Sequence, residues 1–208
     1  MESKVAVNLI KTRFLVLSDT HGMAFTPENH PLQLENRTQH VDVAIHCGDL
    51  TEESKTAEFI TTLELLKSLD AKLKLVIAGN HDFTLDVPIF KKKVAEAIPA
   101  LRADEVSKEY GGYGEIRTLF EDARQSGIMF LDEGTHHFTL DNGASLTVYA
   151  SPYTPSRGEG GFQYSPQEGH TFAIEPNTDV AITHGPPRGI LDFTDAHQRA
   201  GCKDLLQQ

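Results

Sequence analysis

Three short apolar runs in the first half of the chain each end in a cluster of polar residues. They span residues 13–18, 41–47 and 73–78, and their length and abrupt polar ends predict buried strands. Between the second and third runs, apolar residues recur at helical spacing, which predicts a helix over residues 55–69. These residues are Phe59, Leu63, Leu66 and Leu69. Strand, helix and strand in this order predict a right-handed crossover in a parallel sheet.

The second half of the chain contains shorter patterns of the same kind. They predict a helix from about Ile116, strands over residues 128–131, 137–140, 144–150 and 180–183, and a loop over residues 151–161. Asp141-Asn142-Gly143 lies between two of these strands and is typical of a hairpin turn. Residues 201–208 are compatible with the opening turns of a helix. We find no internal repeat and no low-complexity linker, so residues 1–208 are expected to form a single domain.

Composition and charge narrow the range of partners. The 208 residues carry a formal net charge of −11, which argues against a nucleic-acid polymer because that partner needs a basic face. The sequence has no basic segment leading into a long apolar run, and no stretch long enough to span a membrane. Cys47 and Cys202 have no paired spacing, which favours reduced thiols. These features predict a cytoplasmic protein without a membrane partner and leave its oligomeric state open.

Residues with metal-binding side chains follow four of the predicted strands. They are Asp19 and His21, then Asp49, then Asn80 with His81 and Asp82, and finally His184. Open α/β sheets bind ligands at the carboxyl ends of their strands, so these side chains are expected to converge at one edge. Each short motif is common by chance, but four of them at strand ends in one chain favour a metal site. Carboxylates mixed with imidazoles suit Mn, Fe or Zn better than Ca.

The same four motifs carry a family resemblance. In order along the chain, D-T-H, G-D, G-N-H-D and T-H-G-P-P resemble the motifs of the calcineurin-like metallophosphoesterase superfamily. The chain is most similar to the branch of metallophosphoesterase domain-containing proteins, which is related to cyclic-nucleotide phosphodiesterases. The stretches I-H-C-G-D-L-T, S-P-Y-T-P and A-G-C-K-D-L-L support this, so the resemblance extends from about Thr12 to the last residue. It implies an α/β fold, a four-layer α/β/β/α sandwich with two mixed sheets.

The resemblance also implies two divalent metal ions and their ligands. Asp19 and His21 would bind the first ion, Asn80 and His184 the second, and Asp49 would bridge the two. A hydroxide that bridges two such ions is a nucleophile at neutral pH, because the ions lower the pKa of water. The implied activity is that of a hydrolase acting on phosphoric ester bonds.

Two further residues receive catalytic roles from the resemblance. His81 would contact the phosphate and protonate the leaving oxygen, and Asp82 would orient His81. No D-R-G follows G-D-L-T, unlike in the protein Ser/Thr phosphatases of the superfamily, which favours small, nucleotide-like phosphodiesters or phosphomonoesters as substrates. Arg188 could touch a substrate phosphate or be a solvated loop residue. Tyr153 could stack on a base or anchor its loop.

One motif of the family does not occur in these residues. The family closes its site with G-H-x-H, whose two histidines complete the metal coordination, and in this branch it follows the A-G-C-K-D-L-L stretch. The sequence reaches Gln208 without it, so we expect a chain truncated before that motif and its last strands, with weaker metal binding and slower hydrolysis. Two alternatives therefore stand beside the phosphoesterase: a catalytically weak nucleotide-binding protein and an inactive fragment.

The other histidines are interpreted as structural. His46 lies on a predicted buried strand and points away from its neighbours. His136 and His137 are adjacent on a strand, so their side chains point to opposite faces and cannot share one site. His170 lies in a loop, and the sequence identifies no partner for it.

Overall fold

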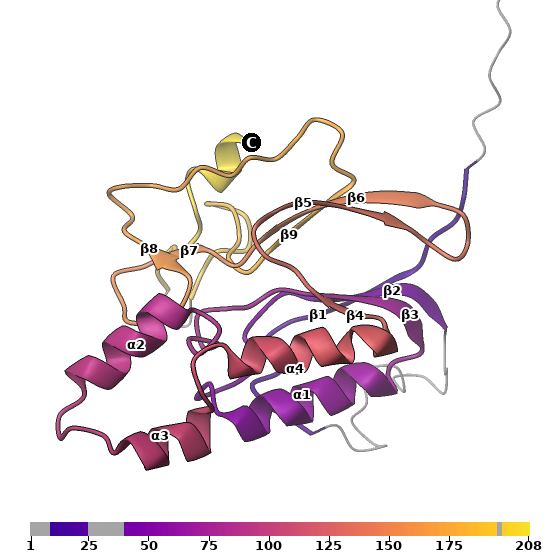
Figure 1. Cartoon of the computed structure of the whole chain (residues 1–208). Helices are drawn as coiled ribbons and strands as arrows, with labels where there is room; N and C mark the ends of the chain where they lie inside the picture. Colours follow the sequence, from indigo (N-terminus) through magenta and orange to yellow (C-terminus); the bar gives the residue numbers. More distant parts are fainter. Residues whose placement is uncertain (1–8, 25–39, 195–196) are drawn as a thin grey trace, which may run out of the picture.

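The computed structural model describes residues 9–24, 40–194 and 197–208, which form two facing sheets with helices on one side (Figure 1). The first sheet contains β1 (Phe14–Leu17), β2 (Val41–His46), β3 (Ala71–Val76) and β4 (Ile128–Phe130). Their order is β1-β2-β3-β4, and each neighbouring pair is parallel. The α/β class and the parallel crossover are therefore confirmed, although β3 begins at Ala71, before the predicted start.

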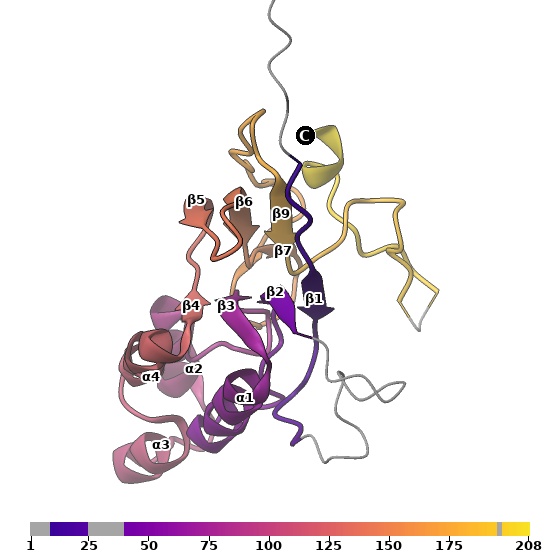
Figure 2. The ribbon, with the colours of Figure 1, turned by 90° about the vertical axis from the view of Figure 1, so that its right-hand side faces the viewer.

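The described residues contain four α-helices: α1 (Thr56–Ser68), α2 (Val87–Glu96), α3 (Ala103–Tyr110) and α4 (Glu115–Ala123), the last continued by the 3₁₀ turn η1 (Arg124–Ser126). α1 and α4 cover the face of the first sheet that points away from the second sheet (Figure 2). α1 begins where the Lys55 N–H donates to the Glu58 carboxylate at 2.9 Å. It buries Phe59, Leu63 and Leu66, which contribute about 1.5–3 kcal/mol each. No helix in this part of the chain is both long and apolar enough to cross a bilayer.

The second sheet contains β5 (Gly134–Thr139), β6 (Ser145–Ser151) and β9 (Val180–Thr183), in the order β5-β6-β9. β5 and β6 are antiparallel around the predicted hairpin turn, and β9 is parallel to β6. Within the described residues only this sheet is mixed. A short parallel pair, β7 (Thr154–Pro155) with β8 (Gln163–Tyr164), begins inside the segment that was predicted to be loop alone.

Three apolar clusters hold these layers together. The cluster between the two sheets includes Val43 and Ile45 of β2 and Val148 of β6. Neighbouring side chains on a strand point to opposite faces, so Ala44 packs under the helices and Tyr149 points away from the first sheet. Tyr149, Phe172, Cys202 and Leu205 form the third cluster, on the outer face of the second sheet.

The segment over residues 201–208 packs on this outer face without forming an α-helix. It contains only the 3₁₀ turn η2 (Leu205–Gln207), so the predicted opening turns of a helix are wrong for the described residues. Its backbone is held by other contacts: the Leu205 N–H donates to the Cys202 sulfur at 3.2 Å, and the Cys202 carbonyl accepts from the Arg188 N–H at 2.8 Å.

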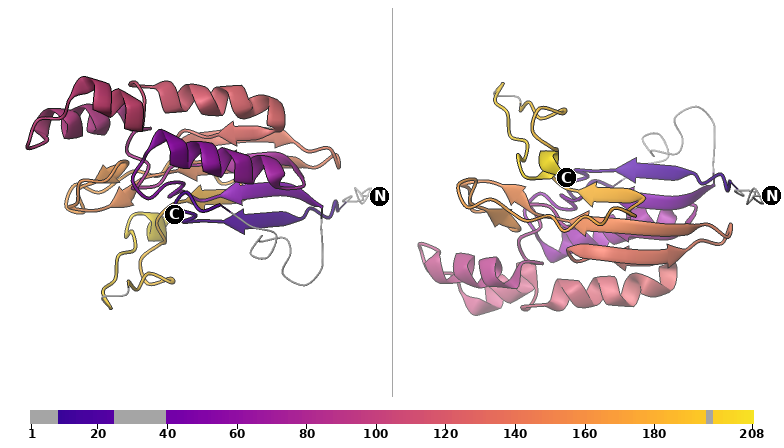
Figure 3. Two further views of the ribbon diagram at one scale, coloured as in Figure 1. Left: turned by 90° about the horizontal axis from the view of Figure 1, so that it is seen from below. Right: turned by 90° about the horizontal axis from the view of Figure 1, so that it is seen from above.

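The strands that carry the predicted metal ligands end on the same side of the sandwich. Figure 3 shows the second sheet lying over the first, with α2 and α3 beyond the end to which β1, β2 and β9 point. The parallel registers of β1 with β2 and of β2 with β3 align these strand ends. The fold therefore brings together loops that are far apart in the sequence.

Candidate metal centre

The loops after β1 and β2 lie side by side and bring three predicted ligands together. The Asp19 N–H donates to the Gly48 carbonyl at 3.0 Å, and the His21 N–H donates to the Asp49 carbonyl at 3.1 Å. Asp19, His21 and Asp49 have φ angles of 53°, 48° and 52°, a left-handed conformation that is strained for such residues and clusters at functional sites. Their ligand atoms lie within 4.8 Å of one another. We call these three residues the first group.

Thr20, between two of these ligands, points into the protein. It is buried, and its hydroxyl forms a hydrogen bond with Nε2 of His46 at 2.9 Å. His46 is fully buried, and this burial lowers its pKa to about 4, so its imidazole is neutral at pH 7. His46 is therefore a structural residue, as expected, and it anchors the loop that carries Asp19 and His21.

Asn80 and His184 meet Asp49 on its other side, and we call these three residues the second group. His184 Nε2 lies 3.1 Å from the side-chain oxygen Oδ1 of Asn80 and 3.4 Å from Asp49 Oδ1. His184 Nδ1–H donates to the Cys47 carbonyl at 2.9 Å, which turns Nε2 toward the two oxygens. Burial lowers the pKa of His184, but the hydrogen bond and the charge of Asp49 outweigh this and raise it above its ordinary value.

The second group fits a metal cation on the chemistry of its atoms. Neutral His184, with its proton on Nδ1, would point the lone pair of Nε2 at two oxygens that also carry lone pairs. Such a cluster needs a positive charge at its centre, which is either a proton on His184 or a metal ion. Burial raises the pKa of Asp49, but the hydrogen bond and charge of His184 and the hydrogen bond from the His81 N–H lower it by more. The pKa of Asp49 is therefore below its ordinary value, and Asp49 stays a carboxylate. The donor set of both groups suits a transition metal or zinc.

Gly79, which follows β3, allows Asp49 and His184 to approach each other closely. A Cβ atom on Gly79 would lie 2.2 Å from Asp49 Oδ1 and 2.7 Å from His184 Cε1. No side chain can occupy that space without displacing both ligands. The glycine of G-N-H-D therefore belongs to the site as much as the asparagine that follows it.

His81 lies beside both groups. Its backbone N–H donates to Asp49 Oδ1 at 2.9 Å, its Nδ1–H donates to the Glu52 carbonyl at 2.7 Å, and its Nε2 lies 4.0 Å from Asp49 Oδ2. Burial lowers its pKa, but the hydrogen bond to Glu52 and the charge of Asp49 outweigh this and raise the pKa. The half-buried ring of His81 therefore combines a free Nε2 with a tendency to be protonated.

The side chain of Asp82 does not contact the ring of His81 as expected, but points to the backbone of two loops. Its fully buried carboxylate accepts hydrogen bonds from the N–H groups of Gly79, Leu50 and Thr51 at 2.8–3.1 Å and from the Thr51 hydroxyl at 2.8 Å. Among the described residues no hydrogen bond joins it to the ring of His81, so the predicted orienting role is wrong. Burial raises its pKa to about 6, although these hydrogen bonds oppose the shift. Asp82 holds the loop after β2 against the loop after β3.

Glu52 belongs to the site but was not predicted from the sequence. Its Oε2 lies 2.9 Å from His21 Nδ1, and its backbone carbonyl holds the ring of His81. His21, Glu52 and His81 also place ligand atoms within 4.8 Å of one another. The signal available in the sequence was its place three residues after Asp49, in G-D-L-T-E. With its Nδ1–H held by the Glu52 carboxylate and by the Thr51 carbonyl at 3.2 Å, His21 keeps Nε2 for an ion.

The two predicted substrate residues lie outside the two groups. The Tyr153 ring stacks on His170 at 4.8 Å between centroids, and His170 Nε2 lies 2.7 Å from the Glu133 carboxylate. These contacts anchor the S-P-Y-T-P loop, and base stacking by Tyr153 stays a prediction. Arg188 lines a cavity of about 660 Å³ that none of the candidate metal ligands lines. A substrate contact of Arg188 also stays a prediction.

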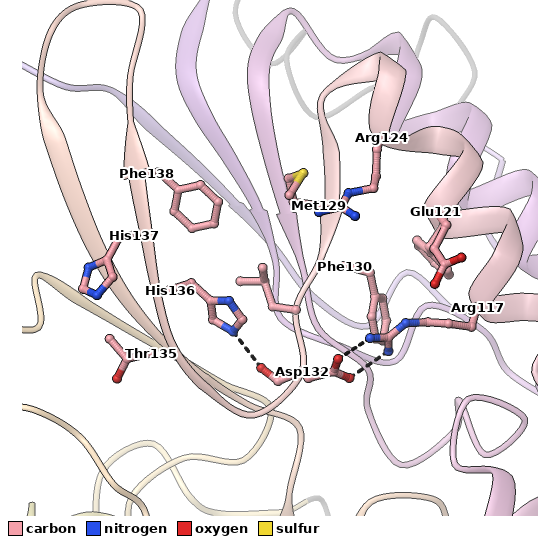
Figure 4. Close-up of a pocket in the computed structure, with 12 residues that line it drawn as sticks. Arg117, Glu121, Arg124, Met129, Phe130, Asp132, Thr135, His136, His137 and Phe138 are labelled. Atoms are coloured by element: carbon pink, nitrogen blue, oxygen red, sulfur yellow. Dashed lines mark hydrogen bonds and ion pairs between the residues drawn. The ribbon is translucent and has the colours of Figure 1, made fainter.

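A further cavity of about 570 Å³ lies between α4, β4 and β5 (Figure 4). In it Arg117 donates two hydrogen bonds to the Asp132 carboxylate, and His136 donates to the Asp132 carbonyl at 2.9 Å. His137 is turned away and contacts the Thr147 hydroxyl at 3.3 Å. None of the residues in the two groups lines this cavity, so we do not assign it to the metal centre.

Comparison with known proteins agrees with this fold and site. Residues 12–207 match the family of calcineurin-like phosphoesterases. The chain belongs to this family, as its four strand-end motifs predicted. The family hydrolyses phosphoric esters with divalent metal ions, and the two groups around Asp49 are candidate ligands for such ions.

Among individual proteins, the chain is 30% identical over 205 residues to metallophosphoesterase domain-containing protein 1 of Homo sapiens. It is 32% identical over 200 residues to UPF0046 protein K07C11.7 of Caenorhabditis elegans. Both alignments cover 94% of this chain, which spans 55% and 58% of the two relatives. A third relative, the probable rhamnogalacturonate lyase C of Emericella nidulans, is 30% identical over the whole chain, which spans only 16% of that protein.

Proposed function

We propose that this chain is a metal-dependent phosphoesterase that hydrolyses small, nucleotide-like phosphodiesters or phosphomonoesters. The observation that carries the proposal is the position of Asp49. One oxygen atom of its carboxylate lies 3.4 Å from His184 Nε2, and the same carboxylate groups with Asp19 and His21. A carboxylate shared between two sets of metal-binding side chains is suited to holding two cations side by side.

Each of the two ions would be bound by three residues. Asp19, His21 and Asp49 would hold one ion, and Asp49, Asn80 and His184 the other. Once bound, two divalent cations would lower the pKa of water and neutralise charge on the substrate phosphate. In a chain of net charge −11, a local positive charge at this site is also what would attract an anionic substrate.

His81 is the candidate general acid. Its Nδ1–H is committed to the Glu52 carbonyl, so a proton on Nε2 would face the site and could pass to the leaving oxygen of the ester. The direction of its pKa shift supports this role, because a raised pKa keeps more of the ring protonated at neutral pH. Asp82 supports the same loops from behind without touching the ring.

The proposal is tested with purified protein stripped of metal and reloaded with Mn²⁺. We expect about two ions per chain by elemental analysis, and hydrolysis of bis-p-nitrophenyl phosphate that is lost on metal removal. His81→Ala should lower the rate by about 100-fold or more, whereas His136→Ala, which changes a histidine outside the site, should leave it unchanged.

Other results would contradict the proposal in different ways. Bound ions with no turnover of any phosphoester would favour the nucleotide-binding alternative. Absence of bound metal under these conditions would favour the inactive fragment. Equal loss of activity in His81→Ala and His136→Ala would contradict a specific role of His81 in the reaction.

A further inference from the structure

A cavity of about 680 Å³, which we call the α2 pocket, lies between α2 and residues 156–165. Its apolar wall includes Ile89, Phe90 and Val94 of α2 and Leu101 beyond the helix. The volume is typical of sites for small organic molecules, which combine apolar walls with a few polar groups. The proposed function as stated above gives these residues no role.

None of the candidate metal ligands lines the α2 pocket, but two segments connect it to the loop that carries Asn80. Phe83, in the loop that carries Asn80, lines the pocket. On the opposite wall, Gly160 lines the pocket and lies against the back of Asn80, because a Cβ atom there would be 2.9 Å from the backbone carbonyl oxygen of Asn80 and 3.0 Å from its Cβ. The neighbouring Gly161 N–H donates to that same oxygen at 2.9 Å. One side of the pocket is therefore built on the backbone of Asn80, whose side-chain oxygen lies in the candidate metal centre, 3.1 Å from His184 Nε2.

Aromatic rings and cations line the same cavity. The Phe83 ring packs against Phe90 and Tyr110, with centroids 6.1 and 5.9 Å apart, and Lys93 Nζ lies 5.0 Å from the Phe83 centroid. Arg157 is an exposed member of the lining, and the described part of the chain offers it no ion pair. Aromatic surfaces favour flat rings. The lining also contains the Lys92–Glu96 ion pair and Glu159, so its cations outnumber its carboxylates by one, which favours a ligand that carries negative charge.

From these observations we infer that the α2 pocket binds an aromatic ring of a phosphate ester whose phosphate lies at the metal centre. The inference rests on the proposed function, because it extends that substrate away from the ions. The ring would lie against Phe83 and the apolar side of α2, and Lys93 and Arg157 would attract the anionic ester. The α2 pocket would then select aromatic esters over aliphatic ones.

The test compares two non-hydrolysable anions, phenylphosphonate and methylphosphonate, which differ only in the ring. Their binding to the Mn²⁺-loaded chain is measured by calorimetry, so that the result does not depend on turnover. We expect phenylphosphonate to bind about tenfold more tightly than methylphosphonate, because the ring leaves water for an apolar wall. Hydrolysis of bis-p-nitrophenyl phosphate is measured separately.

Two alanines on either side of the end of α2 give matched variants. Ala97→Trp places an indole in the pocket that Ala97 lines, and Ala95→Trp places one on the exposed side of the same helix, outside the lining. We expect Ala97→Trp to weaken phenylphosphonate about tenfold and methylphosphonate less than twofold. Ala95→Trp should change neither. Leu101→Ala, at the half-exposed rim, should weaken phenylphosphonate a few-fold even if the larger substitution misfolds.

The outcomes separate the two proposals. Turnover and methylphosphonate binding without a preference for the phenyl compound would overturn the α2 pocket and leave the phosphoesterase intact. A phenyl preference that survives in both pocket variants, or equal weakening of both phosphonates in them, would also overturn it. Ring-dependent binding with no turnover would support the pocket and contradict the phosphoesterase. If neither phosphonate binds, both proposals fail.

Discussion

His184 and His21 hold corresponding places in the two halves of the metal centre, but they are supported in different ways. The side chain of His184 is 7% exposed, and its Nδ1 is fixed by the carbonyl of Cys47 at the end of β2. The side chain of His21 is 29% exposed, and its Nδ1 lies 3.2 Å from the backbone carbonyl of Thr51 and 2.9 Å from the carboxylate of Glu52, whose own side chain is 59% exposed. The ring of His184 is thus oriented by core backbone, whereas the ring of His21 is oriented partly by backbone and partly by a solvated side chain.

This difference predicts unequal ion sites. A ligand oriented by core backbone can move only if the sheet moves, whereas one oriented in part by an exposed carboxylate has a weaker support. We expect the ion at Asp49, Asn80 and His184 to bind more tightly and exchange more slowly than the ion at Asp19, His21 and Asp49. Four measurements test whether the two ion sites differ in this way.

Asp49→Asn should have the largest effect because it removes the one carboxylate that both halves share. We expect loss of both ions and a fall in phosphoesterase activity of about a thousandfold or more, since the site then lacks its central negative charge. Elemental analysis and initial rates check this. Retention of one tightly held ion in the variant would show that the halves are independent.

Gly79→Ala should damage the second group selectively. The added methyl would overlap Asp49 Oδ1 and crowd His184, and we expect a loss of about 3 kcal/mol in the free energy of unfolding together with weaker binding of the second ion. Gly112→Ala is the matched control, because its Cβ would meet only Glu115 Oε2, at 3.4 Å. Urea denaturation of both variants tests this. Equal stability of the two would mean that the loop after β3 adapts easily.

The pH dependence of stability tests the role of His46, which anchors the loop that carries Asp19 and His21. The pKa of His46 is about 4 in the folded protein and about 6.5 in the unfolded chain. Between these values the unfolded chain binds a proton that the folded protein does not, so stability falls as the pH falls. The loss should be about 2 kcal/mol between pH 7 and pH 5. His46→Gln cannot titrate and should show a flatter profile in metal-free urea denaturation. Parallel profiles would contradict this.

Glu52→Ala should have the smallest effect and confine it to the first group. We expect the affinity of one ion to fall by up to about tenfold while the other is unchanged, because His21 loses the carboxylate beside its Nδ1 and keeps only the Thr51 carbonyl. Glu52→Gln keeps an acceptor oxygen and should recover most of the affinity. Glu53→Ala, which removes a neighbouring carboxylate paired with Lys55, is the control. Metal titration would refute this arrangement if Glu53→Ala weakened binding as much as Glu52→Ala.

The sequence predicted the parts of the fold that depend on local pattern. The apolar runs that became β1, β2 and β9 end in polar residues, parallel pairing places the ends of β1 and β2 side by side, and β9 belongs to the facing sheet. The strand ends could therefore be predicted to carry a metal site from pattern, whereas the division of the ligands into two groups around Asp49 came from the family resemblance. The helix over α1 followed equally well from its apolar spacing.

What the sequence did not predict are contacts that depend on how loops curve. Asp82 was expected to orient the adjacent His81, but its carboxylate points instead to the backbone of Leu50 and Thr51, more than thirty residues earlier. His170 had no predictable partner, yet it stacks between Tyr153 and Tyr164. Neither direction is encoded in residue spacing, because each depends on segments that meet only after the sheets have formed.

The chain positions of the ligands also set an order of events during synthesis. Asp19, His21, Asp49 and Glu52 all precede α1, and the first sheet needs no residue beyond β4. His184 follows β9, whose partner in the second sheet is β6. A nascent chain therefore carries all three residues of the first group while it still lacks the histidine of the second. On the ribosome, the less protected ion site is the first that can be loaded.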